Sequence, residues 1–185
     1  AKAFGDDSLN TANGAAADAR GNSSANTAIG SLANASGNGS ANIALGRGAN
    51  ASGANATNMA IGVGATASNN GMAIGTGARA TQSTATAVGS GATANAINSS
   101  AFGAGSSASA GSSAYGVNST ASGSSSSAYG ASSTASGAGS STFGVFSKAS
   151  GDFSSAYGFD SDATGNQSSA YGAFSAATGD RKSVV

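Results

Sequence analysis

The sequence repeats itself at a short and nearly constant interval. A triplet of alanine, a usually apolar residue and glycine recurs, with threonine once replacing the alanine. The spacings between its glycines are 16, 16, 16, 13, 14, 14, 13, 14, 14, 14 and 14 residues. These glycines are Gly14, Gly30, Gly46, Gly62, Gly75, Gly89, Gly103, Gly116, Gly130, Gly144, Gly158 and Gly172. A short period sustained along nearly a whole chain is typical of a solenoid, in which each repeat is one coil that contacts only its neighbours.

Each repeat divides into two halves. A second marker stands seven residues after each of these glycines and is usually preceded by Ala-Ser or Ala-Thr, as at Gly37 and Gly123. Seven residues are too few for a helix with its connection, and runs such as GSSAYG are rich in poor helix formers. They suit a strand of about four residues followed by a tight turn. The repeat therefore predicts an all-β fold, a parallel β-roll (β-solenoid) of about 14-residue coils.

Two columns of the repeat accept almost nothing larger than a methyl group. They lie two positions before each marker, and Thr142 is the one exception in the column before the first marker. Because side chains alternate across a strand, such a face suits the interior of a thin roll, where two strands oppose each other closely. The expected interior residues are Ala28, Ala35, Ala44, Ala51, Ala60, Ala73, Ala87, Ala101, Ala114, Ala128, Thr142, Ala156 and Ala170.

The residue directly before the first marker is bulky and is therefore expected to point outward. These residues form an apolar stripe that changes from aliphatic to aromatic, whereas the matching position before the second marker holds mainly Ser and Thr. Soluble monomers rarely expose such a stripe, so it predicts self-association. The expected interface between chains consists of Ile29, Leu45, Ile61, Ile74, Val88, Phe102, Tyr115, Tyr129, Phe143, Tyr157 and Tyr171.

Composition argues against catalysis and against a nucleic-acid partner. The chain has no His, Cys or Glu, so the usual general bases, thiol nucleophiles and zinc ligands are missing. Seven Lys and Arg balance seven Asp, which gives no basic excess for nucleic acid or an anionic membrane. Asp160 and Asp162 suggest a calcium site only weakly, because pairs of Asp in turns are usually solvated. We expect no enzyme activity, no cofactor and no metal site.

Six further residues are candidates for ligand contact. Arg47, Arg79, Lys148, Phe146, Phe159 and Phe174 follow the first marker closely, which places them on outer turns of the predicted roll. The alternative interpretation is that they keep the rod soluble or line the rim between chains.

The repeat unit resembles a known family. AIGSLANASG (28–37), ALGRGANASG (44–53) and the variant AVGSGATANA from Ala87 resemble the head repeat of trimeric autotransporter adhesins, the YadA-like head. The resemblance covers nearly the whole chain and implies a left-handed parallel β-roll, a parallel homotrimer and display on a Gram-negative outer membrane. It assigns residues 1–179 to the head and leaves 180–185 as the start of a further unit or a connection. No neck, coiled-coil stalk or membrane anchor is recognisable, so the chain resembles a head fragment.

Three functions remain open from the sequence. The resemblance implies a non-catalytic adhesin head that attaches bacteria to host cells or to matrix proteins of the collagen, fibronectin and laminin class, without membrane contact by this segment. The alternative is a self-associating structural or biofilm fibre, which binds copies of itself and no host ligand. The flat Ser/Thr column from Ser36 to Thr178 suggests an ice-binding β-solenoid less strongly, because it lacks a regular Thr-x-Thr ladder.

Overall fold

The computed structural model describes all 185 residues, which form two compact units, Ala1–Ala92 and Thr93–Val185. Every regular element is a β-strand. The structure holds no helix of the length and apolarity that crossing a membrane requires.

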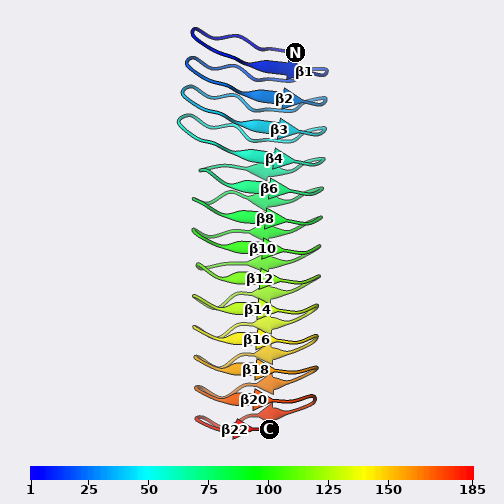
Figure 1. Cartoon of the computed structure of the whole chain (residues 1–185), viewed down its shortest axis with the longest axis vertical. Coiled ribbons are helices and arrows are strands. Elements are labelled where there is room, and N and C mark those ends of the chain that lie inside the picture. The colour runs from blue at the N-terminus through cyan, green and yellow to red at the C-terminus, as the bar shows by residue number, and fades with distance from the viewer. The chain divides into compact units, whose positions relative to one another are not determined.

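The first unit contains six strands of one parallel sheet and two strands of a second. Figure 1 shows its coils following one another in chain order. The first-sheet strands are β1 (Thr11–Asn13), β2 (Thr27–Ile29), β3 (Ile43–Leu45), β4 (Met59–Ile61), β6 (Met72–Ile74) and β8 (Thr86–Val88), and the second-sheet strands are β5 (Thr66–Ala67) and β7 (Arg79–Ala80). In the earliest coils the second sheet is reduced to single bridges that link Lys2, Asp18, Asn34, Asn50 and Thr66.

The second unit contains seven strands of each kind. Its first-sheet strands are β10 (Ser100–Phe102), β12 (Ser113–Tyr115), β14 (Ser127–Tyr129), β16 (Ser141–Phe143), β18 (Ser155–Tyr157), β20 (Ser169–Tyr171) and β22 (Ser183–Val184). Its second-sheet strands are β9 (Thr93–Ala94), β11 (Ser107–Ala108), β13 (Thr120–Ala121), β15 (Thr134–Ala135), β17 (Lys148–Ala149), β19 (Asp162–Ala163) and β21 (Ala176–Ala177). Strands of three and two residues are shorter than the four expected.

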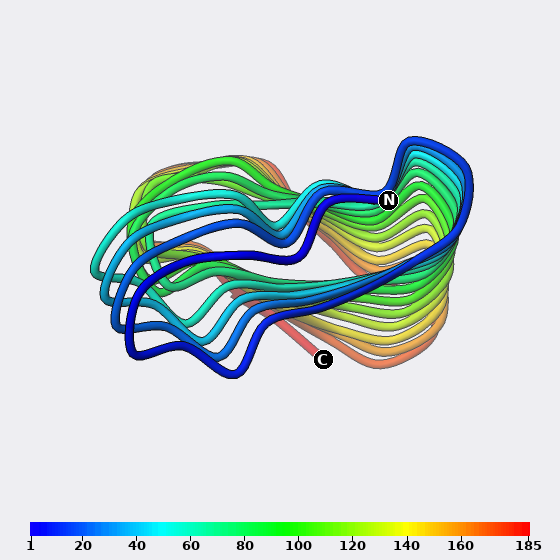
Figure 2. The same cartoon turned by 90° about the horizontal axis from the view of Figure 1, so that it is seen from above.

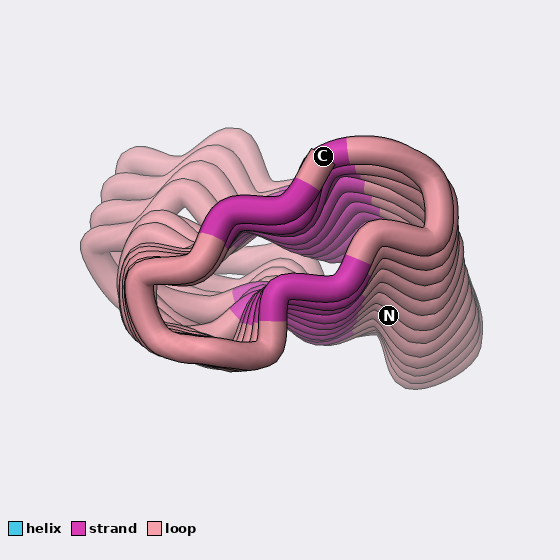
Figure 3. Tube along the Cα trace, turned by 90° about the horizontal axis from the view of Figure 1, so that it is seen from below, coloured by secondary structure: helices cyan, strands magenta, loops and turns pink.

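Each coil pairs with the next in parallel and in register. Ala114 pairs with Ala128, and Tyr115 with Tyr129, so every repeat position is stacked on its own copy. The pairing continues through the turns, where the Phe146 amide donates to the Ala131 carbonyl at 3.0 Å. Figure 3 shows the two strands of a coil facing each other, with turns at both ends. The prediction of an all-β parallel β-solenoid with coils of about 14 residues is confirmed.

The interior is lined by alanine and small polar side chains. All thirteen residues expected inside, including Thr142, are fully buried in the structure. In the second unit buried serines join them, and several cap a turn: the hydroxyls of Ser133 and Ser147 donate to the carbonyls of Gly130 and Gly144 at 2.9 Å. Close packing of such short side chains leaves the backbone ladder and dispersion contacts as the main sources of stability.

The marker glycines are fixed by the approach of neighbouring coils. Gly130 has a φ of 133°, in a region that L side chains rarely adopt. A Cβ at this position would collide with the carbonyl of Gly144 in the next coil. The same clash recurs at the second marker, where a Cβ on Gly137 would meet the Gly151 carbonyl. Stacking at this distance therefore requires glycine in the first marker column. The second column holds glycine in most coils but also accepts Asn69, Gln82, Ala96 and Ala110.

The longer coils of the first unit contain a buried asparagine ladder. Asn26, Asn42 and Asn58 are buried, and the Asn42 side chain donates to the Gly53 carbonyl at 2.8 Å. Its Oδ1 accepts from the Asn58 amide at 3.1 Å, as the Oδ1 of Asn26 does from the Asn42 amide. Figure 2 shows the longer turn of these coils, coloured blue to cyan. The asparagine side chains thus provide hydrogen-bond partners for the Gly53 carbonyl and for the Asn42 and Asn58 amides in coils that are two residues longer than the regular ones.

The thinness of the interior gives a direct test. Ala135→Leu places three extra carbons in a filled interior and should destabilise the chain by about 1–3 kcal/mol or more, because overpacking forces strained rotamers and backbone shifts. Ser136→Leu is the matched control, since Ser136 is exposed directly beside Ala135. Chemical denaturation of both variants measures the difference, and equal stability of the two would contradict a close-packed interior at Ala135.

Candidate interaction surface

The eleven bulky residues before the first marker, which we call the outer column, lie at the ends of first-sheet strands. In the first unit the column is aliphatic, and in-register pairing stacks Ile29 on Leu45 and Leu45 on Ile61. Ile74 and Val88 continue it. Ile29 retains 40% of its surface, although it lies between two neighbouring coils. The outward direction of these side chains leaves an apolar strip on the outer face of the first sheet.

In the second unit the outer column is a stack of aromatic rings. From Phe102 to Tyr171 consecutive ring centroids lie 4.7–5.2 Å apart, and the planes differ by 3–12°. Parallel in-register strands impose this arrangement, because each ring lies directly above its copy. Phe143 and Tyr171 are still 42% and 43% exposed. The rings stack on one another through their faces, so the strip presents mainly ring edges and tyrosine hydroxyls.

Three of the candidate ligand residues come together at the turn beside this column. We call Phe146, Phe159 and Phe174 the phenylalanine cluster. The Phe146 and Phe159 rings meet edge to face at 5.8 Å, and the Phe159 and Phe174 rings at 5.4 Å. The three side chains are 46–71% exposed. The cluster thus spans three successive coils of the second unit as one rigid aromatic patch.

Two members of the cluster occupy strained backbone positions. Phe146 and Phe174 have φ values of 62° and 60°, in the left-handed region. The same position of other coils holds residues that tolerate this conformation, such as Gly105 and Asn118. A bulky residue there costs on the order of 1 kcal/mol or more. Within the chain the edge-to-face contacts with Phe159 offset part of that cost, while much of each ring stays in water.

The charged candidates are dispersed. Arg47 lies on a turn of the first unit, as expected, but the placement of Arg79 and Lys148 on turns is wrong. They belong to β7 and β17 and extend from the outer face of the second sheet, because the second strand begins within four residues of the first marker. Lys148 stands in register with Asp162 of the next coil. Arg47, Arg79 and Lys148 are exposed and each offers a single charge on the surface.

The position directly after the first marker holds apolar residues that sequence reasoning missed. Val63, Val117 and Val145 occupy it with 43%, 53% and 38% exposure, and Phe159 stands at the same position. The signal for them is present in the sequence, since the position after each first marker can be compared across the repeats.

Possible ion sites are sparse. No group of three or more His, Cys, Asp or Glu converges in the structure. Asp160 lies on a turn with a φ of 51°, whereas Asp162 is part of β19, so the two do not share a turn. A polar pocket of about 400 Å³ is lined by Asn166, Gln167, Asp180 and Arg181. Its side chains are already engaged with one another: Arg181 Nε donates to Gln167 Oε1 at 3.2 Å.

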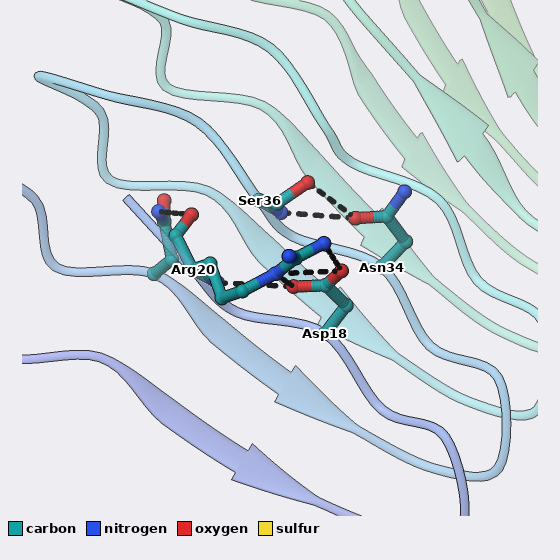
Figure 4. Close-up of polar contacts among 5 residues, drawn as sticks. Asp18, Arg20, Asn34 and Ser36 are labelled. Atoms are coloured by element: carbon teal, nitrogen blue, oxygen red, sulfur yellow. Dashed lines mark hydrogen bonds and ion pairs between the residues drawn. The ribbon is translucent and has the colours of Figure 1, made fainter. Parts of the chain in front are cut away.

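One ion pair is formed on the outer face of the first unit. Arg20 Nε donates to Asp18 Oδ1 at 2.8 Å, and Arg20 Nη2 lies 2.5 Å from Asp18 Oδ2 (Figure 4). One coil further, Asn34 Oδ1 accepts from the Ser36 amide and hydroxyl in the same way. The Arg20 hydrogen bond holds the pKa of the Asp18 carboxyl below its usual value of 3.8, although partial burial opposes the shift.

This pair predicts a small pH dependence. Since the pKa of Asp18 is lower in the folded than in the unfolded chain, the pair stabilises the fold above about pH 4, and its contribution is lost as the pH falls through the folded pKa. Arg20→Ala should raise the pKa of Asp18 toward its ordinary value in an NMR titration of the carboxyl carbon. Arg47→Ala, which removes a distant cation, should leave it unchanged; an unshifted Asp18 in the Arg20 variant would refute the pairing.

Comparison with known proteins gives a family match. The family model described as the YadA head domain repeat matches residues 43–57, 68–92, 80–106, 114–140 and 141–161, which together make up more than half of the chain. A comparison with curated proteins finds no match.

Among solved structures, the chain is similar to the crystal structure of the collagen-binding domain of the Yersinia adhesin YadA. The two are 26% identical, the similarity covers 91% of this chain and 69% of that one, and the TM-score is 0.41.

Proposed function

The chain belongs to the YadA head domain repeat family, and on that basis we propose that it forms the head of a trimeric cell-surface adhesin. The head is non-catalytic, and it attaches the bacterium to host cells or to extracellular matrix. Residues 1–179 are the head roll in this proposal, and 180–185 begin a further unit. In agreement with this, β22 lies within 180–185 and pairs with β20 as the earlier first-sheet strands pair with one another.

The observation that carries the proposal is the outer column. Its eleven residues form an unbroken column of bulky apolar side chains on the first sheet, they are aligned by register, and they keep up to 43% of their surface. Burying apolar surface stabilises association by about 25 cal/mol per Å² as a gross figure. We therefore assign the column to the interface of a parallel homotrimer. The roll itself is too thin to bury these side chains, so a second chain is the remaining way to remove them from water.

The surfaces left free by such an interface are the candidates for ligand contact. Arg79 and Lys148 lie on the outer face of the second sheet, opposite the outer column, and Arg47 lies on a first-unit turn. We propose a matrix protein of the collagen, fibronectin or laminin class as the partner, contacted through these exposed cations and the Ser/Thr positions around them. The head is displayed on the exterior of a Gram-negative outer membrane in this proposal.

The trimer is tested at the middle of the aromatic stack. Tyr129→Ser removes one ring from the proposed interface in each chain and should weaken association by about tenfold or more, because a buried aromatic anchor contributes at least about 1.4 kcal/mol. Thr134→Ser, on the second sheet of the same coil, is the control. Light scattering across a dilution series measures the masses, and a wild-type chain that stays monomeric at micromolar concentration would disprove the interface.

Adhesion separates the competing functions. Cells that display this head should bind surfaces coated with collagen, fibronectin or laminin better than bare surfaces, and charge removal at Arg79 and Lys148 should reduce the difference. A self-associating fibre would instead clump cells without any preference for the coating. Thermal hysteresis of the purified chain would support the ice-binding alternative, for which the mixed Ser and Thr positions are a poor template.

A further inference from the structure

We infer that the phenylalanine cluster is a contact surface for a second copy of this chain and extends the proposed interface around one edge of the roll. The inference rests on the proposed trimer. It assigns to assembly three residues that the sequence alone left open between ligand contact and the rim between chains.

The cluster is continuous with the outer column. Phe159 follows Tyr157 by two residues, and Phe174 follows Tyr171 by three, with only the marker glycine and one or no further residue between them. Val145, 38% exposed, stands on the adjoining coil at the position of Phe159. In the second unit the cluster therefore lies on the turn directly after the strands that carry the aromatic stack, and we take the two as neighbouring parts of one interface.

The fold of a single chain does not require phenylalanine in the cluster. Phe146 and Phe174 hold left-handed positions that other coils fill with varied residues, among them Gly105, Asn118 and Leu32. Their rings are at least half exposed, so they contribute little burial in return. In an isolated chain, asparagine at these positions would lower both the backbone strain and the exposed apolar surface. A contact that buries the rings would instead make the phenylalanines stabilising.

The chemistry of the patch favours another copy over a polar ligand. The turn amides within it are used by the ladder between coils: the amides of Asp160 and Phe174 donate to the carbonyls of Val145 and Phe159 at 2.9 Å. The described polar pocket is lined by Asn166, Gln167, Asp180 and Arg181 and by none of the three phenylalanines, whereas small-molecule sites combine a concave surface with convergent polar groups. An exposed apolar surface whose rings pack on one another is therefore better suited to contact an apolar surface of another copy of the chain than to bind a polar ligand.

The position of the cluster on one edge also fits cyclic assembly. An isologous twofold contact uses the same patch on both partners, whereas a ring is closed by two different surfaces of each subunit. The phenylalanines lie only on the turn that follows the first-sheet strand, so in a ring they meet a different surface of the neighbouring chain. The outer column would face the shared axis, and the cluster would close each contact between neighbours.

The test uses substitutions that the repeat itself provides. The triple variant Phe146→Asn, Phe159→Ser and Phe174→Asn places in the cluster the residue types found at Asn118 and Ser31, at equivalent positions of other coils. Phe153→Asn is the matched control, because Phe153 is also left-handed, with a φ of 56°, and is exposed, but lies on the opposite turn. The concentration at which trimers dissociate is measured by light scattering, together with adhesion to coated surfaces.

We expect the triple variant to raise the dissociation concentration by about tenfold or more and the control to leave it within about twofold. Unchanged dissociation with lost adhesion would overturn the inference and assign the cluster to ligand binding. Unchanged dissociation and adhesion would overturn it as well, and would leave the trimer in place. A monomeric wild-type chain would refute the proposed trimer and the inference together, so the two failures are distinguishable.

Discussion

The distance between neighbouring coils governs the rest of the structure. Every repeat position is hydrogen-bonded to its own copy one coil away, in the strands and in the turns, so the coils stack at the spacing of a parallel sheet. Glycine is required at the first marker, where a Cβ would meet the backbone of the next coil, and small residues, mainly alanine and serine, are required where two strands oppose each other. With the interior of the regular coils reserved for small residues, most variation in size and all variation in charge lie on the outer surface, and the buried asparagines of the longer coils are the main exception.

This confinement explains why so much was predictable from the sequence. The column that contains Ala101, Ala114 and Ala128 holds a small residue in every coil. Because the same pattern recurs in each coil, it identifies the buried face even though a single short strand would not. The same logic identified Tyr115 and Tyr129 as outward, and the family resemblance is shown by the match over more than half of the chain. Handedness and the number of chains in the assembly are not set by the pattern, because the stacking constraint is local to one chain.

The features that sequence reasoning missed do not repeat along the whole chain. The buried ladder that contains Asn42 exists only where coils are longer. The strand that carries Arg79 begins four residues after the first marker, at a position that the repeat pattern assigns to a turn. The grouping of Phe146 with Phe159 depends on side-chain directions at a left-handed turn. Such directions follow from backbone angles that single residues do not specify, since Gly, Asn and Phe all occupy this turn position.

The confinement of length changes to the second turn has an evolutionary consequence. The half-repeat after the first marker is always seven residues long, whereas the other half holds the longer coils together with their asparagine ladder. Because each coil pairs only with its two neighbours, duplication or deletion of one whole repeat in the gene would change the height of the stack and preserve every lateral contact. Gain or loss of a repeat would therefore change the number of coils and leave the surface chemistry of the remaining coils as it is.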